Sequence, residues 1–120
     1  MTIVQKGVSV AAKYELKKAK NGQFFFNLKA ANGEVILTSE TYKQKDGAGN
    51  GIESVKKNSG NEAMFERKVA SNGQHYFVLK AANQEVIGKS ETYSSSSGTT
   101  KGIASVKRNG PAARVVDLTA

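Results

Sequence analysis

Aromatic and basic side chains at matching places in the two halves of the chain are the strongest candidates for chemistry. Phe25 and Lys29 lie four residues apart, and Tyr76 and Lys80 repeat this spacing. Residues four apart in an extended strand share one face of a sheet. Because aromatic rings stack on bases and lysines neutralise phosphates, such a face suits a nucleic acid or another polyanion. The alternative is that Phe25 and Tyr76 form cross-strand pairs or are buried in a dimer.

A repeated Glu-Thr-Tyr sequence, ending at Tyr42 and again at Tyr93, is the second candidate. Two copies of it suggest two symmetry-related pockets. The competing interpretation is that each tyrosine packs where the sheet meets a helix, while its hydroxyl meets a backbone group or water. With both features included, the candidate binding surface consists of Phe25, Lys29, Tyr76, Lys80, Tyr42 and Tyr93.

No set of residues carries a catalytic or cofactor signature. The chain has no cysteine, and its one histidine, His75, takes the place that Phe24 has in the first half, which favours packing. Gly47 to Gly51 lacks the spacing of a dinucleotide loop, and we expect a flexible loop entering a helix. Ser94 to Gly102 lacks the residue order of a phosphate loop, so we expect a helix cap or a solvated loop. We therefore expect no enzymatic activity, no cofactor and no metal site.

The formal net charge of +8 favours an acidic partner, such as a nucleic acid or an acidic protein. The alternative is that the charge only keeps the protein in solution. No apolar run is long enough for a signal peptide or a membrane span, so we expect a cytoplasmic protein without a membrane partner. A non-enzymatic interaction module is our first hypothesis. Binding of a polyanion on a basic sheet face is the alternative.

An internal repeat governs how these residues are positioned. Leu28 begins the sequence LKAANGEVI, and Leu79 begins LKAANQEVI. A shift of 51 residues superposes residues 13–58 on residues 64–109 without a gap. We place an extension at 1–12, a first repeat at 13–60 and a second at 61–120, forming one compact domain over 13–118. Because one repeat is too short to bury a sufficient core, we expect both to share one, which gives a monomer by internal duplication.

Each repeat contains the signals for three strands and a helix. In the first, Tyr14 and Leu16 alternate with charged residues, and Phe26 and Leu28 are the expected core of the next strand, as are Phe77 and Leu79 in the second repeat. Asn32-Gly33 favours a two-residue type I′ turn. Gln84 replaces that glycine in the second repeat, so we expect strain there or another turn type.

The helices follow at Ile52–Val55 and Ile103–Val106, and each begins as early as residue 43 or 94. Gly51 and Gly102 precede their apolar residues, which predicts close approach to the sheet. Residues 114–118 superpose on 63–67, so one long strand at 63–67 both ends the first repeat and begins the second. The predicted fold class is α+β. Tandem β-β-β-α-β units form one antiparallel-rich sheet with two helices on one face, and the C-terminal strands are exchanged between units.

These residues resemble the YegP-like family of small bacterial proteins. The resemblance rests on the LKAANGEVI hairpin, the SETY segment with its tail of small residues, and NGIESVKKN before a Gly/Pro stop, and it covers roughly residues 13–118. It implies tandem or dimerised β3-α-β units that form a single sheet with C-terminal strands exchanged between units. It brings no activity, cofactor or catalytic residue.

Overall fold

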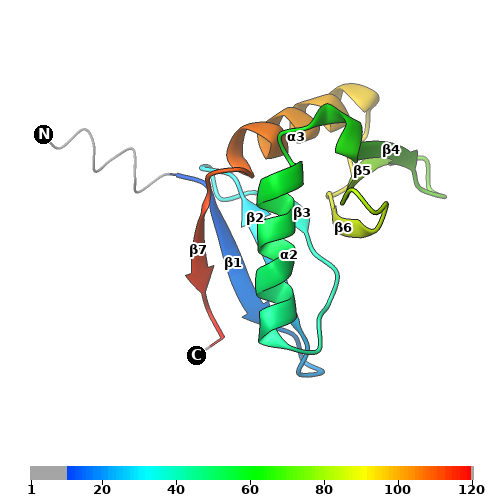
Figure 1. Cartoon of the computed structure of the whole chain (residues 1–120). Coiled ribbons are helices and arrows are strands. Elements are labelled where there is room, and N and C mark those ends of the chain that lie inside the picture. Colours follow the sequence, from blue (N-terminus) through cyan, green and yellow to red (C-terminus); the bar gives the residue numbers. More distant parts are fainter. Residues whose placement is uncertain (1–10, 120) are drawn as a thin grey trace, which may run out of the picture.

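The computed structural model describes residues 11–119, so residues 1–10 of the predicted extension and Ala120 lie outside the described residues. Figure 1 shows one sheet with two helices packed against it. The first repeat contains β1 (Lys13–Lys18), β2 (Phe24–Lys29), β3 (Val35–Thr38) and α2 (Lys45–Asn58). A short 3₁₀ helix (Glu62–Met64) then leads into β4 (Phe65–Val69), β5 (His75–Lys80), β6 (Val86–Lys89), α3 (Ser96–Asn109) and β7 (Arg114–Asp117).

The seven strands form one sheet in the order β4-β5-β6-β3-β2-β1-β7. Strands β3 and β6 meet in the middle through the pair Thr38 and Lys89, so the sheet is continuous across the two repeats. The pairing of β7 with β1 is parallel, whereas the other pairings are antiparallel. Since β7 ends the second repeat and β1 begins the first, the predicted strand exchange and the predicted α+β class are both confirmed.

The junction between the repeats differs in detail from the predicted long strand. Ala63 and Met64 belong to the 3₁₀ helix, and Asn61 caps this helix by accepting a hydrogen bond from the Ala63 amide. Strand β4 therefore starts at Phe65 and pairs with β5. It follows α2 as a last strand and opens the second repeat as a first strand, which leaves seven strands where two complete units would have eight.

The core lies between the helices and one face of the sheet. Tyr14, Phe26, Leu28, Phe77 and Leu79 are fully buried, as the alternation of apolar residues predicts. Ile52 and Val55 of α2 and Ile103 and Val106 of α3 complete one cluster with them. Helix α2 contacts β5 and β6 as well as β2, and α3 contacts β3 as well as β5. Figure 1 shows the helices lying crosswise, so each helix covers strands of both repeats.

The hairpin turns differ from the predicted type I′ form. The Ala30 amide bonds to the Glu34 carbonyl, and the Gly33 amide bonds to the Ala30 carbonyl, which makes a longer loop than two residues. Only Gly33 of this turn has a positive φ, at 87°, whereas a type I′ turn needs positive φ at both central residues. Gln84 takes the same place in the second repeat with φ of 75°, so the turn is retained and a side chain accepts the left-handed conformation.

Two further sequence expectations are settled inside the helices. Gly47 to Gly51 is not a flexible loop, because these residues form the first turns of α2, whose hydrogen bonds outweigh the low helix propensity of glycine. Gly51 and Gly102 do allow a close approach. A Cβ at either residue would lie 3.0 Å from Cε2 of Phe26 or Phe77 and would collide with the hydroxyl of Tyr42 or Tyr93.

Candidate functional site

The face of the sheet opposite the helices carries four of the six predicted site residues. Phe25 is paired with Lys17, and Lys29 with Lys13, so all four side chains lie on the face that does not contact α2 or α3. Tyr76 is paired with Lys68 in the second repeat, and Lys80 is on the same face. We call this the outer face. Its basic residues on the strands are Lys13, Lys17, Lys29, Lys68, Lys80, Lys89 and Arg114, and its acidic residues are Glu15 and Glu66.

Glu15 is the centre of the outer face in the first repeat. Its carboxylate lies 3.0 Å from Nζ of Lys29, 3.4 Å from that of Lys13 and 3.5 Å from that of Lys17. Burial by itself would raise the pKa of Glu15, but the hydrogen bonds from Lys29 and Lys13 and the charges of Lys29 and Lys17 hold it below its ordinary value. One carboxylate therefore organises three lysines and leaves an excess of positive charge.

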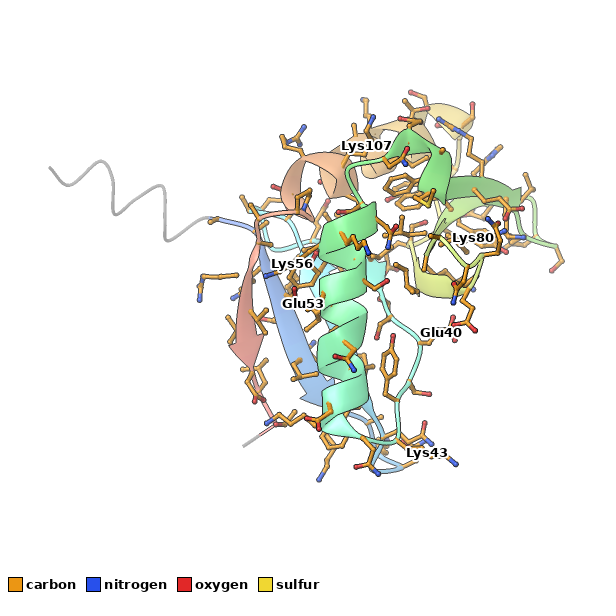
Figure 2. All side chains as sticks on the ribbon, viewed as in Figure 1. Glu40, Lys43, Glu53, Lys56, Lys80 and Lys107 are labelled. Carbon is orange, nitrogen blue, oxygen red and sulfur yellow. The ribbon has the colours of Figure 1, made fainter. Side chains whose placement is uncertain are left out.

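The second repeat copies this arrangement around Glu66. Lys80, labelled in Figure 2, reaches the Glu66 carboxylate on β4, and Lys68 lies 3.5 Å from it. Lys89 Nζ lies 5.0 Å above the Tyr76 ring, a cation–π distance. Phe25 pairs with Lys17 and Tyr76 pairs with Lys68, so both rings form cross-strand pairs with lysines, in agreement with the alternative interpretation.

Tyr42 and Tyr93 do not join the other four predicted residues. Each forms a single antiparallel bridge, with Phe24 and with His75, and each ring lies under a helix against Gly51 or Gly102. Sequence periodicity could not place them, because both follow a strand rather than lying within one. Burial raises the pKa of both hydroxyls, so both stay neutral at neutral pH and neither is suited to act as a base.

The segment from Ser94 to Gly102, which was compared with a phosphate loop, has a structural role at the start of α3. Ser95 caps α3 by accepting a hydrogen bond from the Gly98 amide at 3.2 Å, as expected for a helix cap. Within residues 11–119, no three carboxylate or imidazole side chains gather to hold a metal ion. Neither described helix is long and apolar enough to span a membrane.

Two clefts between the repeats were missed by sequence reasoning. The first cleft, of about 560 Å³, lies between the β2–β3 hairpin and α3, and its lining includes Ile36, Tyr93, Lys101 and Arg108. The second cleft, of about 430 Å³, lies between the β5–β6 hairpin and α2. Each therefore joins a hairpin of one repeat to the helix of the other. The spacing of Lys101, Ser105 and Arg108 marks one helix face in the sequence, but nothing local shows what this face meets.

Comparison with known proteins matches both halves of the chain to one family model. The model, described as a domain of unknown function (DUF1508), matches residues 19–66 and again residues 70–117. The predicted repeat bounds of 13–60 and 61–120 stay a prediction.

Similar proteins come from several bacteria. The UPF0339 protein YegP of Escherichia coli is 51% identical over 110 residues, which cover 92% of this chain and 100% of that protein. A UPF0339 protein of Pseudomonas aeruginosa is 57% identical over 108 residues, covering 90% of this chain and 98% of that one.

Two solution NMR structures share the fold. That of YegP from E. coli, described as a protein of unknown function, has a TM-score of 0.87 at 51% identity and covers 92% of this chain and 95% of that one. That of a UPF0339 protein from Shewanella oneidensis has a TM-score of 0.85 at 54% identity and covers 91% of this chain and 92% of that one.

Proposed function

The chain belongs to the DUF1508 family, and we propose that it is a non-enzymatic binding module that engages a single-stranded nucleic acid through the outer face of its sheet. The single observation that carries this proposal is the excess of lysines over carboxylates on that face. A sheet that is covered by helices on one side only presents a broad, continuous surface on the other, and an extended polyanion fits such a surface.

Electrostatics supports a phosphate backbone as the ligand. Three lysines share Glu15 in the first repeat, and two share Glu66 in the second, so positive charge remains after the ion pairs are formed. The Glu66 side chain is exposed, so its lysine pairs are weak and a phosphate competes for Lys68 and Lys80 at modest cost. Glu15 is largely buried, but one carboxylate neutralises only one of its three lysines. Association then releases counterions from the nucleic acid, which supplies most of the affinity at low salt.

The two aromatic rings favour a nucleic acid over an acidic protein. Phe25 on β2 and Tyr76 on β5 are both half-buried and lie on the same face as the lysines. Strands β3 and β6 lie between them, which separates the two rings by three strand spacings of roughly 4.8 Å across the sheet. The register adds about four residues along the strands, so the rings lie roughly 20 Å apart on a diagonal. Bases that are not paired can stack on both rings while the backbone passes between them over the lysines.

The test is fluorescence anisotropy with a labelled single-stranded oligonucleotide, titrated at several salt concentrations. We expect log affinity to fall linearly with log salt, with a slope of about −0.7 for each phosphate neutralised. The double variant Lys29→Ala, Lys80→Ala should flatten this slope. The double variant Phe25→Ala, Tyr76→Ala should weaken binding at every salt concentration and leave the slope unchanged.

A matched control removes the same charge from the other side of the molecule. Lys43 and Lys57 lie before and within α2 and are exposed, so Lys43→Ala, Lys57→Ala lowers the net charge as Lys29→Ala, Lys80→Ala does. The control should keep the slope of the unmodified protein. The absence of binding at low salt would overturn the proposal. An equal loss of affinity in the Lys29→Ala, Lys80→Ala variant and in the Lys43→Ala, Lys57→Ala control would also overturn it.

A further inference from the structure

The two clefts between the repeats are equivalent by internal symmetry but differ in charge. The shift of 51 residues places Ser105 on Ser54 and Asn109 on Asn58, and these pairs line the first and second cleft respectively. In both clefts the asparagine side chain donates hydrogen bonds to the serine, at 2.9 and 3.2 Å in the first cleft and at 2.8 and 3.3 Å in the second. The shared frame makes the second cleft an internal reference for the first.

The first cleft has an excess of positive charge that the second lacks. Lys101 corresponds to Asn50, and Arg108 corresponds to Lys57, while the second cleft also contains the carboxylate of Glu53. Two cations therefore line the first cleft, whereas one lysine and one carboxylate, both on α2, line the second. Neither Lys101 nor Arg108 forms an ion pair with a carboxylate of residues 11–119, so both charges are available to a ligand.

Lys101 and Arg108 are exposed residues on one face of α3. Lys101 and Arg108 are seven residues apart, two helical turns or roughly 10 Å along the axis, and both line the cleft. Ser105 lies between them on the same face, and its oxygen already accepts from Asn109 at 3.2 Å, which directs its own proton elsewhere. An anionic group held between the two long side chains can therefore also accept a hydrogen bond from the Ser105 hydroxyl.

The opposite wall of the first cleft is mainly apolar. Ala30 and Ile36 come from the β2–β3 hairpin, and the half-buried ring of Tyr93 lies beside the start of α3. Glu34 is the acidic residue in this lining, so two cations outnumber one carboxylate. A volume of about 560 Å³ exceeds the needs of an inorganic ion and falls in the range of sites for small organic ligands.

We propose that the first cleft binds a small organic anion, with its phosphate or carboxylate group between Lys101 and Arg108 and its apolar body against Ile36 and Tyr93. This site lies on the helix side of the sheet and is separate from the outer face. The second cleft, with Asn50 and Glu53 in its lining, does not bind the same ligand.

The test follows backbone amide shifts by NMR during titration of the whole chain with phenyl phosphate. Inorganic phosphate and phenol serve as separate probes for the anion and for the apolar body, and benzoate distinguishes a carboxylate ligand from a phosphate ligand. We expect phenyl phosphate or benzoate to shift amides of residues 30–36 and 101–109, and to bind at least about tenfold more tightly than inorganic phosphate or phenol. Residues 50–58 and 81–83 of the second cleft should stay unperturbed.

Variants that exchange residues between the clefts sharpen the test. Lys101→Asn installs the residue of the second cleft, and we expect the affinity of the first cleft for phenyl phosphate to fall about tenfold. Lys57→Asn removes a charge from the second cleft and should leave this affinity unchanged. In the unmodified protein, equal amide shifts in both clefts, shifts confined to the outer face, or no shifts with either organic anion would overturn the proposal. An unchanged affinity for phenyl phosphate in a folded Lys101→Asn variant would overturn it as well.

Discussion

Leu37 on β3 occupies the space that a side chain at Gly88 on β6 would need. A Cβ placed on Gly88 would lie 2.7 Å from both Cγ and Cδ2 of Leu37. The two residues are equivalent in the repeats and meet where β3 pairs with β6, in the middle of the sheet. Internal symmetry brings the two positions face to face, and the space there accepts one leucine only.

This relationship predicts a strong dependence of stability on the pair. Gly88→Ala should lower the free energy of unfolding by about 1–3 kcal/mol, because Leu37 is fully buried and cannot move away freely. Urea denaturation monitored by circular dichroism measures the change. The double variant Leu37→Ala, Gly88→Ala should lose less stability than the sum of the losses of the two single variants. The truncation of Leu37 makes room for the methyl group at residue 88. Strictly additive effects would show that the contact does not limit packing.

Gln84, in the turn of the β5–β6 hairpin, has a left-handed backbone conformation and offers a stabilising substitution. Gln84 has φ of 75°, where a side chain is strained, and Gly33 has φ of 87° in the equivalent turn. Gln84→Gly should raise the melting temperature, with a gain of about 1 kcal/mol in the free energy of unfolding. The reciprocal change Gly33→Gln should lower it by a similar amount. If Gln84→Gly were destabilising, the glutamine side chain would have to contribute a compensating contact.

A buried hydrogen bond ties the first strand to the end of the last helix. The Tyr14 hydroxyl donates to the Gly110 carbonyl at 2.6 Å, and the Tyr14 side chain is fully buried. Tyr14→Phe should cost about 1–3 kcal/mol, because the buried carbonyl loses its partner.

The same tyrosine predicts a loss of stability in alkaline solution. Burial first, and then the charge of Glu53, raise the pKa of Tyr14 far above its ordinary value of 10.0. The folded state therefore favours the neutral hydroxyl, and its contribution is complete below pH 10 and is lost as the pH rises above that value. Urea midpoints measured from pH 8 upward should fall more steeply for the unmodified protein than for Tyr14→Phe. Parallel pH profiles would contradict the assignment.

Glu15 links stability to the proposed binding face. Because its pKa is lowered in the folded state, its ion pairs stabilise the protein above pH 4.5 and are lost as the pH falls below that value. Because Glu15 is largely buried and accepts hydrogen bonds from charged lysines, Glu15→Gln should cost about 1–3 kcal/mol at pH 7. It should also tighten oligonucleotide binding in the anisotropy assay, because three lysines lose their carboxylate. Glu53→Gln is the control, because it removes one negative charge from α2 and raises the net charge by the same amount. An equal gain in oligonucleotide affinity in both variants would indicate a non-specific charge effect.

The shared core predicts that neither repeat folds alone. Helices α2 and α3 each contact strands of both repeats, and β7 pairs with β1 across the whole chain. Separate chains of residues 1–60 and 61–120 should show no cooperative unfolding. When mixed, they should recover the circular dichroism and amide spectrum of the intact protein. A cooperative, monomeric fold for either fragment would contradict the account of one common core.

Local pattern was sufficient for much of the fold and part of the site. Alternation of apolar residues identified Phe26 and Leu28 as core, and the same alternation placed Phe25 and Lys29 on the opposite face. The turn type was wrong because Asn-Gly dipeptides occur in several turns, and hydrogen bonding between the flanking residues decides among them. Tyr42 was included in the candidate surface because the Glu-Thr-Tyr sequence is repeated, and its position outside a strand left no alternation from which to predict the face that it occupies.

The sequence alone determined the duplication, the order of strands and helices, and the central residues of the core, because these depend on spacing within a few residues. It did not give the first turns of α2 or the 3₁₀ helix at the junction. Only the tertiary structure decided that β3 lies beside β6, that the exchanged strand β7 pairs with β1 in parallel, and that each hairpin faces the helix of the other repeat. These relationships join residues far apart in the chain, and they arise from packing two twisted units around one core. The contact of Leu37 with Gly88 and the placement of Lys101 and Arg108 in the first cleft also depend on the tertiary structure, because no short stretch of sequence indicates either.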